Sequence, residues 1–293
     1  RDSINSGEIV FSRNSQDILN ILTSLIWAKL ALKDSKWNPS VTHLDTIEKL
    51  ALILRNLRHS DAGLPRFHGS CGDVDGQLDQ ALSHAESREI SLSETNVGYV
   101  KLSNSRTSVI IDAAPPLMGK EAVKADASTL AFEMVSGQRR VFTSCGPGYL
   151  FGSDLSFSSR RTSSHCTVHI DNHDSSEFRS DEGWLQAPKK VILNGPRTVP
   201  KEISSNEGTK IFEGAHDGYV KNFGLTHVRK LKLSQDGQSF EGEDLMIAIK
   251  DSHKRRFDKI FKKSGSTQMS VKAAFHLHPC LLYTSDAADD TPC

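Results

Sequence analysis

Apolar residues recur at helical spacing in the first third of the chain. One stripe runs from Ser15 to Lys33, where Ser15 is a suitable N-cap and Trp37-Asn38-Pro39 ends the pattern. A second stripe runs from Asp45 to Arg58 and opens with an Asp45/Glu48 capping-box pattern. A weaker stripe covers Asp75 to His84. These patterns predict three amphipathic helices whose apolar faces belong to a core.

From Tyr99 onward the pattern changes to alternation of apolar and polar residues, which is typical of strands. A hairpin is predicted over Thr129–Thr143, where Leu130, Phe132 and Met134 alternate before a turn at Gly137. Further short strands are predicted at Tyr99–Leu102, Thr107–Asp112, Cys166–Ile170, Lys190–Leu193, Lys210–Phe212, Val228–Leu233, Met246–Ile249 and Val271–His278.

These patterns predict an α+β protein of more than one domain. Residues 1–90 are expected to be helical, and residues 91–279 to form an antiparallel β-sandwich. Residues 280–293 break the strand pattern, and we interpret them as translated sequencing-adapter sequence or as a disordered acidic tail.

Composition narrows the possible functions. Lysine plus arginine equal aspartate plus glutamate at 36 each, so global charge favours neither nucleic acid nor a membrane surface. No stretch is apolar enough to predict a membrane span. Five cysteines without a C-x-x-C pair argue against a disulfide framework. The chain begins at Arg1 without a leader, so we expect that it is truncated and that any secretion signal lies upstream.

A series of short blocks occurs in a fixed order between Arg55 and Pro279. The blocks read DAAPP, ASTLAFE, SGQRRV, CGPG, SSHCTVHID, DSSEF, HDGY, GLTHVRKLKLS, GEDL and FHLHP. Their order resembles the C-terminal region of bacterial heparinase II/III-like proteins. The resemblance implies the end of an α/α toroid followed by a β-sandwich, and a polysaccharide lyase of the periplasm or cell envelope.

Such lyases cleave uronic-acid glycans by β-elimination, which needs a base, an acid and a group that neutralises the carboxylate. Histidine and tyrosine suit the proton transfers. The resemblance and the residue types make His165, His216 and Tyr219 the catalytic candidates. The alternatives remain open: His165 as a polar residue at a strand edge, and His216 with Tyr219 as parts of a structural turn.

Cationic and imidazole groups suit the carboxylate clamp. Arg161 beside the SSH block, His68 in the loop His59–Gly72, and His227 are the candidate substrate-binding residues. His227 also fits a strand histidine with no ligand.

The family's zinc ligands are largely replaced here. Where the resembled pattern has His-Ala-His-Ala, this chain reads Lys124-Ala-Asp126-Ala, and Ser144 stands where an aspartate is usual. His165 alone keeps the ligand type, and one histidine with one carboxylate does not make the usual closed site. A zinc ion is therefore expected only if His165 and Asp126 share it with further ligands, and no other cofactor is expected.

Three hypotheses follow. The first is a lyase acting on an anionic, uronic-acid-containing polysaccharide of the heparin or alginate type. The second is a non-catalytic glycan-binding or structural cell-envelope protein of the same fold. The third, nucleic-acid binding, rests on the basic run His253–Lys263, which is more typical of a solvated connection. We therefore expect a polysaccharide partner and no nucleic acid, and the oligomeric state stays open.

Overall fold

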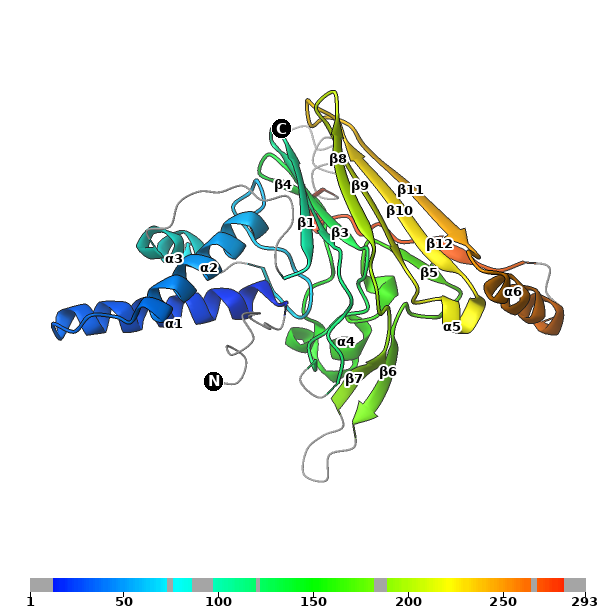
Figure 1. Cartoon of the computed structure of the whole chain (residues 1–293), viewed down its shortest axis with the longest axis horizontal. Coiled ribbons are helices and arrows are strands. Elements are labelled where there is room, and N and C mark those ends of the chain that lie inside the picture. Colours follow the sequence, from blue (N-terminus) through cyan, green and yellow to red (C-terminus); the bar gives the residue numbers. More distant parts are fainter. Residues whose placement is uncertain are drawn as a thin grey trace, which may run out of the picture.

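The first three helices lie on one side of the sheets (Figure 1). The structure is a computed structural model that describes residues 13–72, 76–85, 97–119, 122–181, 189–264 and 268–281. Figure 1 shows the first three helices on one side, the strands in the middle, and a further helix, α6, at the opposite end. The predicted boundary near residue 90 and the tail from residue 282 onward lie outside the described residues.

The three predicted helices are confirmed, with shifted starts. Asn14, not Ser15, caps the first helix, because its side chain accepts two backbone N–H hydrogen bonds from the first turn. Ser40 caps the second helix, five residues before Asp45, so the predicted capping box at Asp45 and Glu48 is wrong. The helices are α1 (Ser15–Asp34), α2 (Val41–Leu57) and α3 (Gln77–Ala85).

The apolar stripes of these helices face one another and the first sheet. Leu22, Leu50 and Leu54 are fully buried in a cluster that also contains Tyr99 and Ile110 from the strands. Each such leucine contributes roughly 1.5–3 kcal/mol by its removal from water. The helical part therefore rests directly on the sheet. That it ends an α/α toroid stays a prediction.

Two four-stranded antiparallel sheets form the β part, which confirms the sheets predicted from alternation. Their strand orders are β1-β2-β3-β4 and β11-β10-β9-β8. Phe132 from the first sheet shares one apolar core with Phe212 and Leu231 from the second. The strands are β1 (Tyr99–Asn104), β2 (Thr107–Asp112), β3 (Phe132–Ser136), β4 (Arg139–Phe142), β8 (Lys201–Asn206), β9 (Thr209–His216), β10 (Thr226–Leu233) and β11 (Phe240–Ile247).

Two smaller sheets pair β5 (Val168–Ile170) with β12 (Val271–Ala273) and β6 (Glu177–Asp181) with β7 (Lys189–Asn194). The predicted strands at 166–170 and 271–278 are longer than those found. Beyond Ala273 the chain leaves β5, and Leu277 forms an isolated bridge with Phe142 instead. This segment therefore crosses from one sheet to another.

The basic run predicted as a connection lies in a helix, α6 (Asp251–Ser264). Phe257 packs on the apolar cluster around Tyr219 and Phe223, while the basic side chains of Lys254 and Arg255 are exposed. Two short helices are α4 (Ser153–Ser158) and α5 (Val220–Phe223). In the described ranges, no helix has the length and hydropathy needed to cross a membrane.

Candidate functional site

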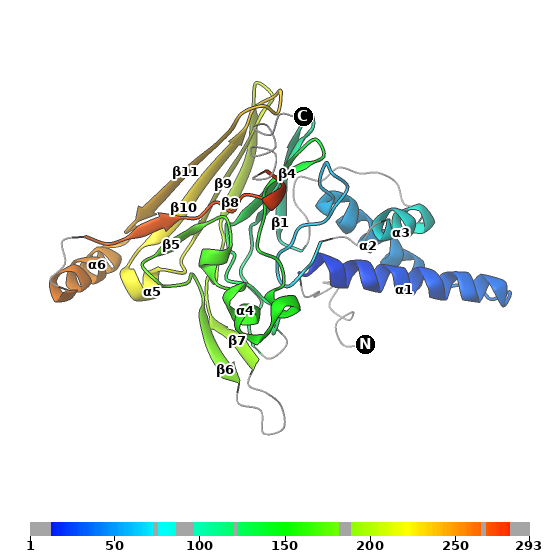
Figure 2. The same ribbon diagram turned by 180° about the vertical axis from the view of Figure 1, so that it is seen from behind.

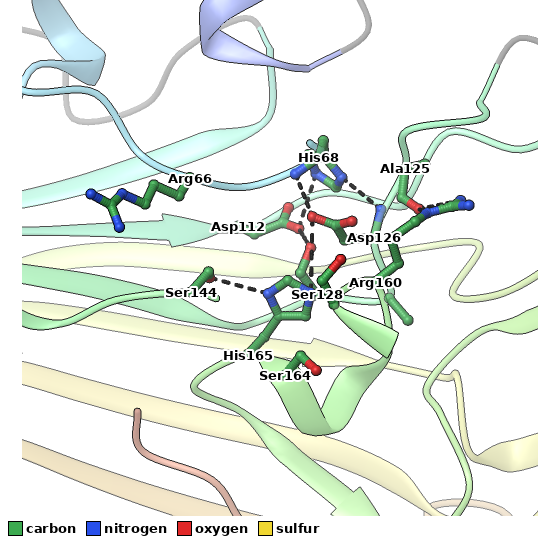
Figure 3. Close-up of polar contacts among 12 residues, drawn as sticks. Arg66, His68, Asp112, Ala125, Asp126, Ser128, Ser144, Arg160, Ser164 and His165 are labelled. Carbon is green, nitrogen blue, oxygen red and sulfur yellow. Dashed lines mark hydrogen bonds and ion pairs between the residues drawn. The ribbon is translucent and has the colours of Figure 1, made fainter. Parts of the chain in front are cut away.

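A buried polar cluster lies where the loop after α2 meets the first sheet. The His68 backbone N–H donates to Asp126 Oδ2, and the Asp126 backbone N–H donates to His68 Nδ1 at 3.1 Å. Both residues are buried, with at most 3% of their surface exposed. Figure 3 shows His68 and His165 on either side of the carboxylates of Asp112 and Asp126.

Asp112, at the end of β2, anchors this cluster. Its carboxylate accepts hydrogen bonds from Arg13 and from the Ser128 hydroxyl, the latter at 2.6 Å. His68 Nε2 lies 3.3 Å from Asp112 Oδ2 but is not aligned to donate to it. Burial favours a raised pKa for Asp112, but Arg13, His68 and Ser128 outweigh it and hold that pKa well below the ordinary range. Asp112 is therefore a carboxylate at neutral pH.

His165 is the last member of this polar cluster. It follows a short turn of 3₁₀ helix and is 1% exposed. Its Nδ1 lies 3.1 Å from Ser144 Oγ, and its Nε2 lies 3.9 Å from Asp126 Oδ2 without a hydrogen-bond partner. The structure thus brings together His68, His165, Asp126 and Ser144, four residues singled out from the sequence.

Burial shifts the pKa values of Asp126 and His165 in opposite directions, so that the pKa of the carboxyl lies above that of the imidazole. Burial raises the pKa of Asp126 to about 6, although His68 and Arg160 act against it. Burial, with the neighbouring His68, lowers the pKa of His165 to about 3. His165 is therefore a neutral imidazole near pH 7, and Asp126 titrates close to it. Such shifts are common at catalytic sites, although buried structural networks produce them too.

The donors described here do not fit a zinc ion. Within the described residues, no three histidine, cysteine, aspartate or glutamate side chains are arranged to hold a metal. Ser144 is bonded to His165 Nδ1, and Asp126 already accepts the His68 backbone N–H. The polar cluster is held together by its own hydrogen bonds.

His216, Tyr219 and His227 form a second buried cluster, apart from the first. Gly218 N–H donates to His216 Nδ1 at 3.1 Å, so His216 Nε2 carries the proton and donates to His227 Nδ1 at 3.1 Å. His227 Nε2 then donates to Asp244 Oδ1 at 2.7 Å. Each ring nitrogen in this chain of hydrogen bonds has a partner, which leaves none for a substrate.

The surroundings of this cluster keep its groups neutral. Burial, with the neighbouring His227 and Arg229, lowers the pKa of His216 well below its ordinary value. Burial raises the pKa of Tyr219, whose hydroxyl donates to the Val168 carbonyl at 2.8 Å. Hydrogen bonds within the protein hold these three side chains in place. Their predicted catalytic and substrate-binding roles stay predictions.

Arg161 lies outside both buried clusters. Its Nε donates to Asp174 Oδ2 at 3.0 Å, and its side chain is about one-third exposed. It lines a pocket beside α5 that contains none of the residues of either buried cluster. The structure therefore does not bring Arg161 together with His165.

Sequence reasoning did not single out several members of the clusters as site residues, among them Arg13, Asp112 and Asp244. Arg13 is 5% exposed and pairs with Asp112 across nearly a hundred residues, and no local pattern marks such a contact. Asp244 forms a two-point ion pair with Arg229, at 2.7 and 2.8 Å. The only sequence signal was that Arg229 stands at an inward position of an alternating strand, where an arginine needs a buried partner.

About two thirds of the sequence matches a family description. A sequence model of the heparinase II/III-like C-terminal region matches residues 90–291. The chain belongs to the heparinase II/III-like family. FtsZ-localized protein C of Caulobacter vibrioides is 28% identical over 261 residues, which are 87% of this chain and 43% of that protein.

Solved structures share the fold of this heparinase II/III-like chain. A heparinase III structure superposes with a TM-score of 0.58 at 16% identity, over 80% of this chain and 38% of the other. The heparan sulfate lyase HepC from Pedobacter heparinus superposes with a TM-score of 0.58 at 15% identity, over 81% and 38%. The chain thus spans about two fifths of the length of these proteins.

Proposed function

We propose that this chain is the C-terminal part of a lyase that cleaves an anionic, uronic-acid-containing polysaccharide by β-elimination. The observation that carries the proposal is the polar cluster of His68, Asp126 and His165 where the helical part meets the sheet. Family membership and the likeness to heparinase III and heparan sulfate lyase structures support it.

His165 is in the protonation state that can accept a proton. Its lowered pKa of about 3 keeps the imidazole neutral near pH 7 and also makes it a weak base, so a proton that it accepts has to pass on to a group of higher pKa. When Nδ1–H donates to Ser144 Oγ, Nε2 keeps a free lone pair that can accept the C5 proton of a uronate. Asp126, with a pKa raised to about 6 and its carboxylate 3.9 Å away, can exchange a proton with that nitrogen.

This mechanism also requires that the polymer can reach His165. His68 and His165 are each 1% exposed, so the polymer reaches Nε2 only if the seam between loop His59–Gly72 and the sheet opens. We propose that this seam opens in the longer protein. Further residues of that protein would supply the carboxylate clamp and the acid for the leaving oxygen.

The test uses the full-length protein with heparin, heparan sulfate, chondroitin sulfate, hyaluronan and alginate. β-Elimination creates an unsaturated uronate, and its ultraviolet absorbance follows the reaction. We expect growth of this signal on at least one polymer and a loss of about 100-fold or more in His165→Ala, in line with removal of a catalytic base. His169→Ala, a half-exposed histidine in the same segment, is the matched control and is expected to keep its rate.

A second candidate is a non-catalytic glycan-binding protein of the cell envelope. The enclosure of His165, His216 and Tyr219, each at most 1% exposed, favours it. The similarity to a protein named for its localisation with FtsZ makes localisation with FtsZ part of this candidate function. Polysaccharide binding without product formation, together with recruitment of a fluorescent fusion to the division site, would support this candidate over the lyase.

A further inference from the structure

A polar pocket of about 600 Å³ lies between the β6–β7 hairpin and α5. Figures 1 and 2 both show α5 on the side of the sheets away from α1–α3, so the pocket does not adjoin the helical part. Its walls come from the turn at 172–176, the ends of β6 and β7, and the segment that leads into α5. Neither His68, Asp126 nor His165 lines it.

Four cationic side chains line this pocket, and two of them are uncommitted. Arg161 pairs with Asp174, and Lys221 pairs with Glu177 at 2.8 Å. Arg197 and Arg256 are exposed, and neither guanidinium has a hydrogen bond or ion pair to the described part of the chain. Two guanidinium groups are thus free to bind an anion.

A buried hydroxyl also points to a ligand. Ser176 lines the pocket at 5% exposure, and its Oγ has no hydrogen-bond partner in the described residues. An unpaired buried hydroxyl costs stability, and a bound polar ligand can supply the missing partner. Asn172 and Asn194 add amide groups to the same walls.

Two phenylalanine rings supply the apolar part of the pocket. Phe157 and Phe178 both line it and meet edge to face, with ring centroids 5.2 Å apart. Lys190 and Arg160 lie over these rings and hold them in place. Ring faces, amides and guanidinium groups together suit a sugar ring that carries a negative charge.

We infer that this pocket binds an anionic sugar unit, a uronate or a sulfated sugar, at a site separate from the His68–Asp126–His165 cluster. The choice of polysaccharide as ligand rests on the proposed function, whereas the pocket's preference for an anion rests on Arg197 and Arg256. In a lyase, this site holds a part of the polymer remote from the cleaved bond. In a non-catalytic protein, it is the binding site itself.

The test is calorimetric titration of the full chain with short oligosaccharides at low and high salt. The probes are an unsulfated uronate tetrasaccharide, a heparin-derived tetrasaccharide, neutral maltotetraose and inorganic sulfate. We expect one or both anionic sugars to bind, more weakly at high salt, and at least about tenfold more tightly than maltotetraose or sulfate. The tighter of the two identifies the anion as carboxylate or sulfate.

Three variants locate the site. Arg197→Ala combined with Arg256→Ala is expected to weaken binding at least tenfold, since each loses a charged hydrogen-bond donor. Ser176→Ala is expected to weaken binding without loss of thermal stability, because its hydroxyl has no partner in the free protein. Arg139→Ala removes an exposed arginine on β4, outside the pocket, and is the matched control.

Several results would overturn the inference: no binding of either anionic sugar, equal binding of maltotetraose or of sulfate alone, or unchanged binding in the double arginine variant. Comparison of binding with product formation separates this inference from the lyase proposal. Oligosaccharide binding by the wild-type protein with no product from any polymer would contradict the lyase and leave the sugar pocket standing.

Discussion

His68 and Asp126 are joined by two reciprocal hydrogen bonds, each from the backbone N–H of one residue to the side chain of the other. The pair fastens the loop after α2 to the segment before β3, 58 residues away in sequence. Asp126 occupies a position where the resembled pattern has a histidine. The Asp126 carboxylate at this position accepts the His68 backbone N–H.

The raised pKa of Asp126 predicts a pH dependence of stability. Its folded pKa of about 6 exceeds the ordinary value near 4, so the folded state binds the proton more tightly. The stability from this group is present below about pH 4 and is lost as pH rises through about 6. The unfolding free energy of wild type minus that of Asp126→Asn should therefore fall between about pH 4 and 6 and stay level above. Urea denaturation at several pH values measures it, and a flat difference would contradict the assignment.

The lowered pKa of His165 predicts that stability changes with pH in the opposite direction. Its folded pKa of about 3 lies below the ordinary value near 6.5, so stability is present above about pH 6.5 and is lost as pH falls. The unfolding free energy of wild type minus that of His165→Gln should rise between about pH 4 and 6.5, at most about 1.4 kcal/mol per pH unit. The same denaturation series provides the measurement. A difference that fell over this range would mean that His165 is not buried as a neutral ring.

Asp244 is predicted to be a main support of the second sheet. Asp244→Asn removes the charge that neutralises Arg229, which is 1% exposed, and weakens the acceptor of His227. Loss of one partner of a buried pair costs about 3–5 kcal/mol, and we expect about 3 kcal/mol because Asp244 is partly exposed. Glu243→Gln, an exposed acid on the same strand, is the control and should change stability by less than about 0.5 kcal/mol. Equal effects of the two changes would refute the argument.

Substitution of Gly224, compared with substitution of Gly137, tests how closely α5 packs against α6. Gly224 has φ +72°, and a Cβ there would lie 2.3 Å from the His253 carbonyl oxygen. Gly137 has φ +62° with open space around it. Gly137→Ala should cost about 1 kcal/mol from backbone strain alone, and Gly224→Ala at least about 2 kcal/mol more. Chemical denaturation of both variants measures the difference. Similar losses would show that α6 moves away from Gly224 without cost.

The order of helices and strands could be predicted because most elements have one buried face. The strand β10 alternates buried and half-buried residues along nearly its whole length, and that period is visible in the sequence. By contrast, β8 (KEISSN) has a single apolar residue, Ile203, and forms a strand because it pairs with β9. Tertiary pairing, rather than local pattern, decides such an edge strand.

The sequence prediction of α6 failed because its charge pattern was given more weight than its apolar spacing. Phe257 and Phe261 stand four residues apart, their rings pack 4.8 Å from each other, and Phe257 contacts the cluster around Tyr219. This spacing was a helix signal within the basic run. The candidate site shows the same limit: residue types suggested His165 and Asp126, but the contacts between them depend on the fold.

Cleavage in water enriched in ¹⁸O, followed by mass spectrometry of the products, tests the central claim most directly. The full-length protein would act on the polysaccharide that gives the strongest absorbance signal, beside a known hydrolase as control. β-Elimination predicts unsaturated products that are lighter by one water than hydrolysis products and carry no label at the cleaved bond. Labelled, saturated products would contradict the lyase, and an uncleaved polymer on every substrate would favour the non-catalytic glycan-binding protein.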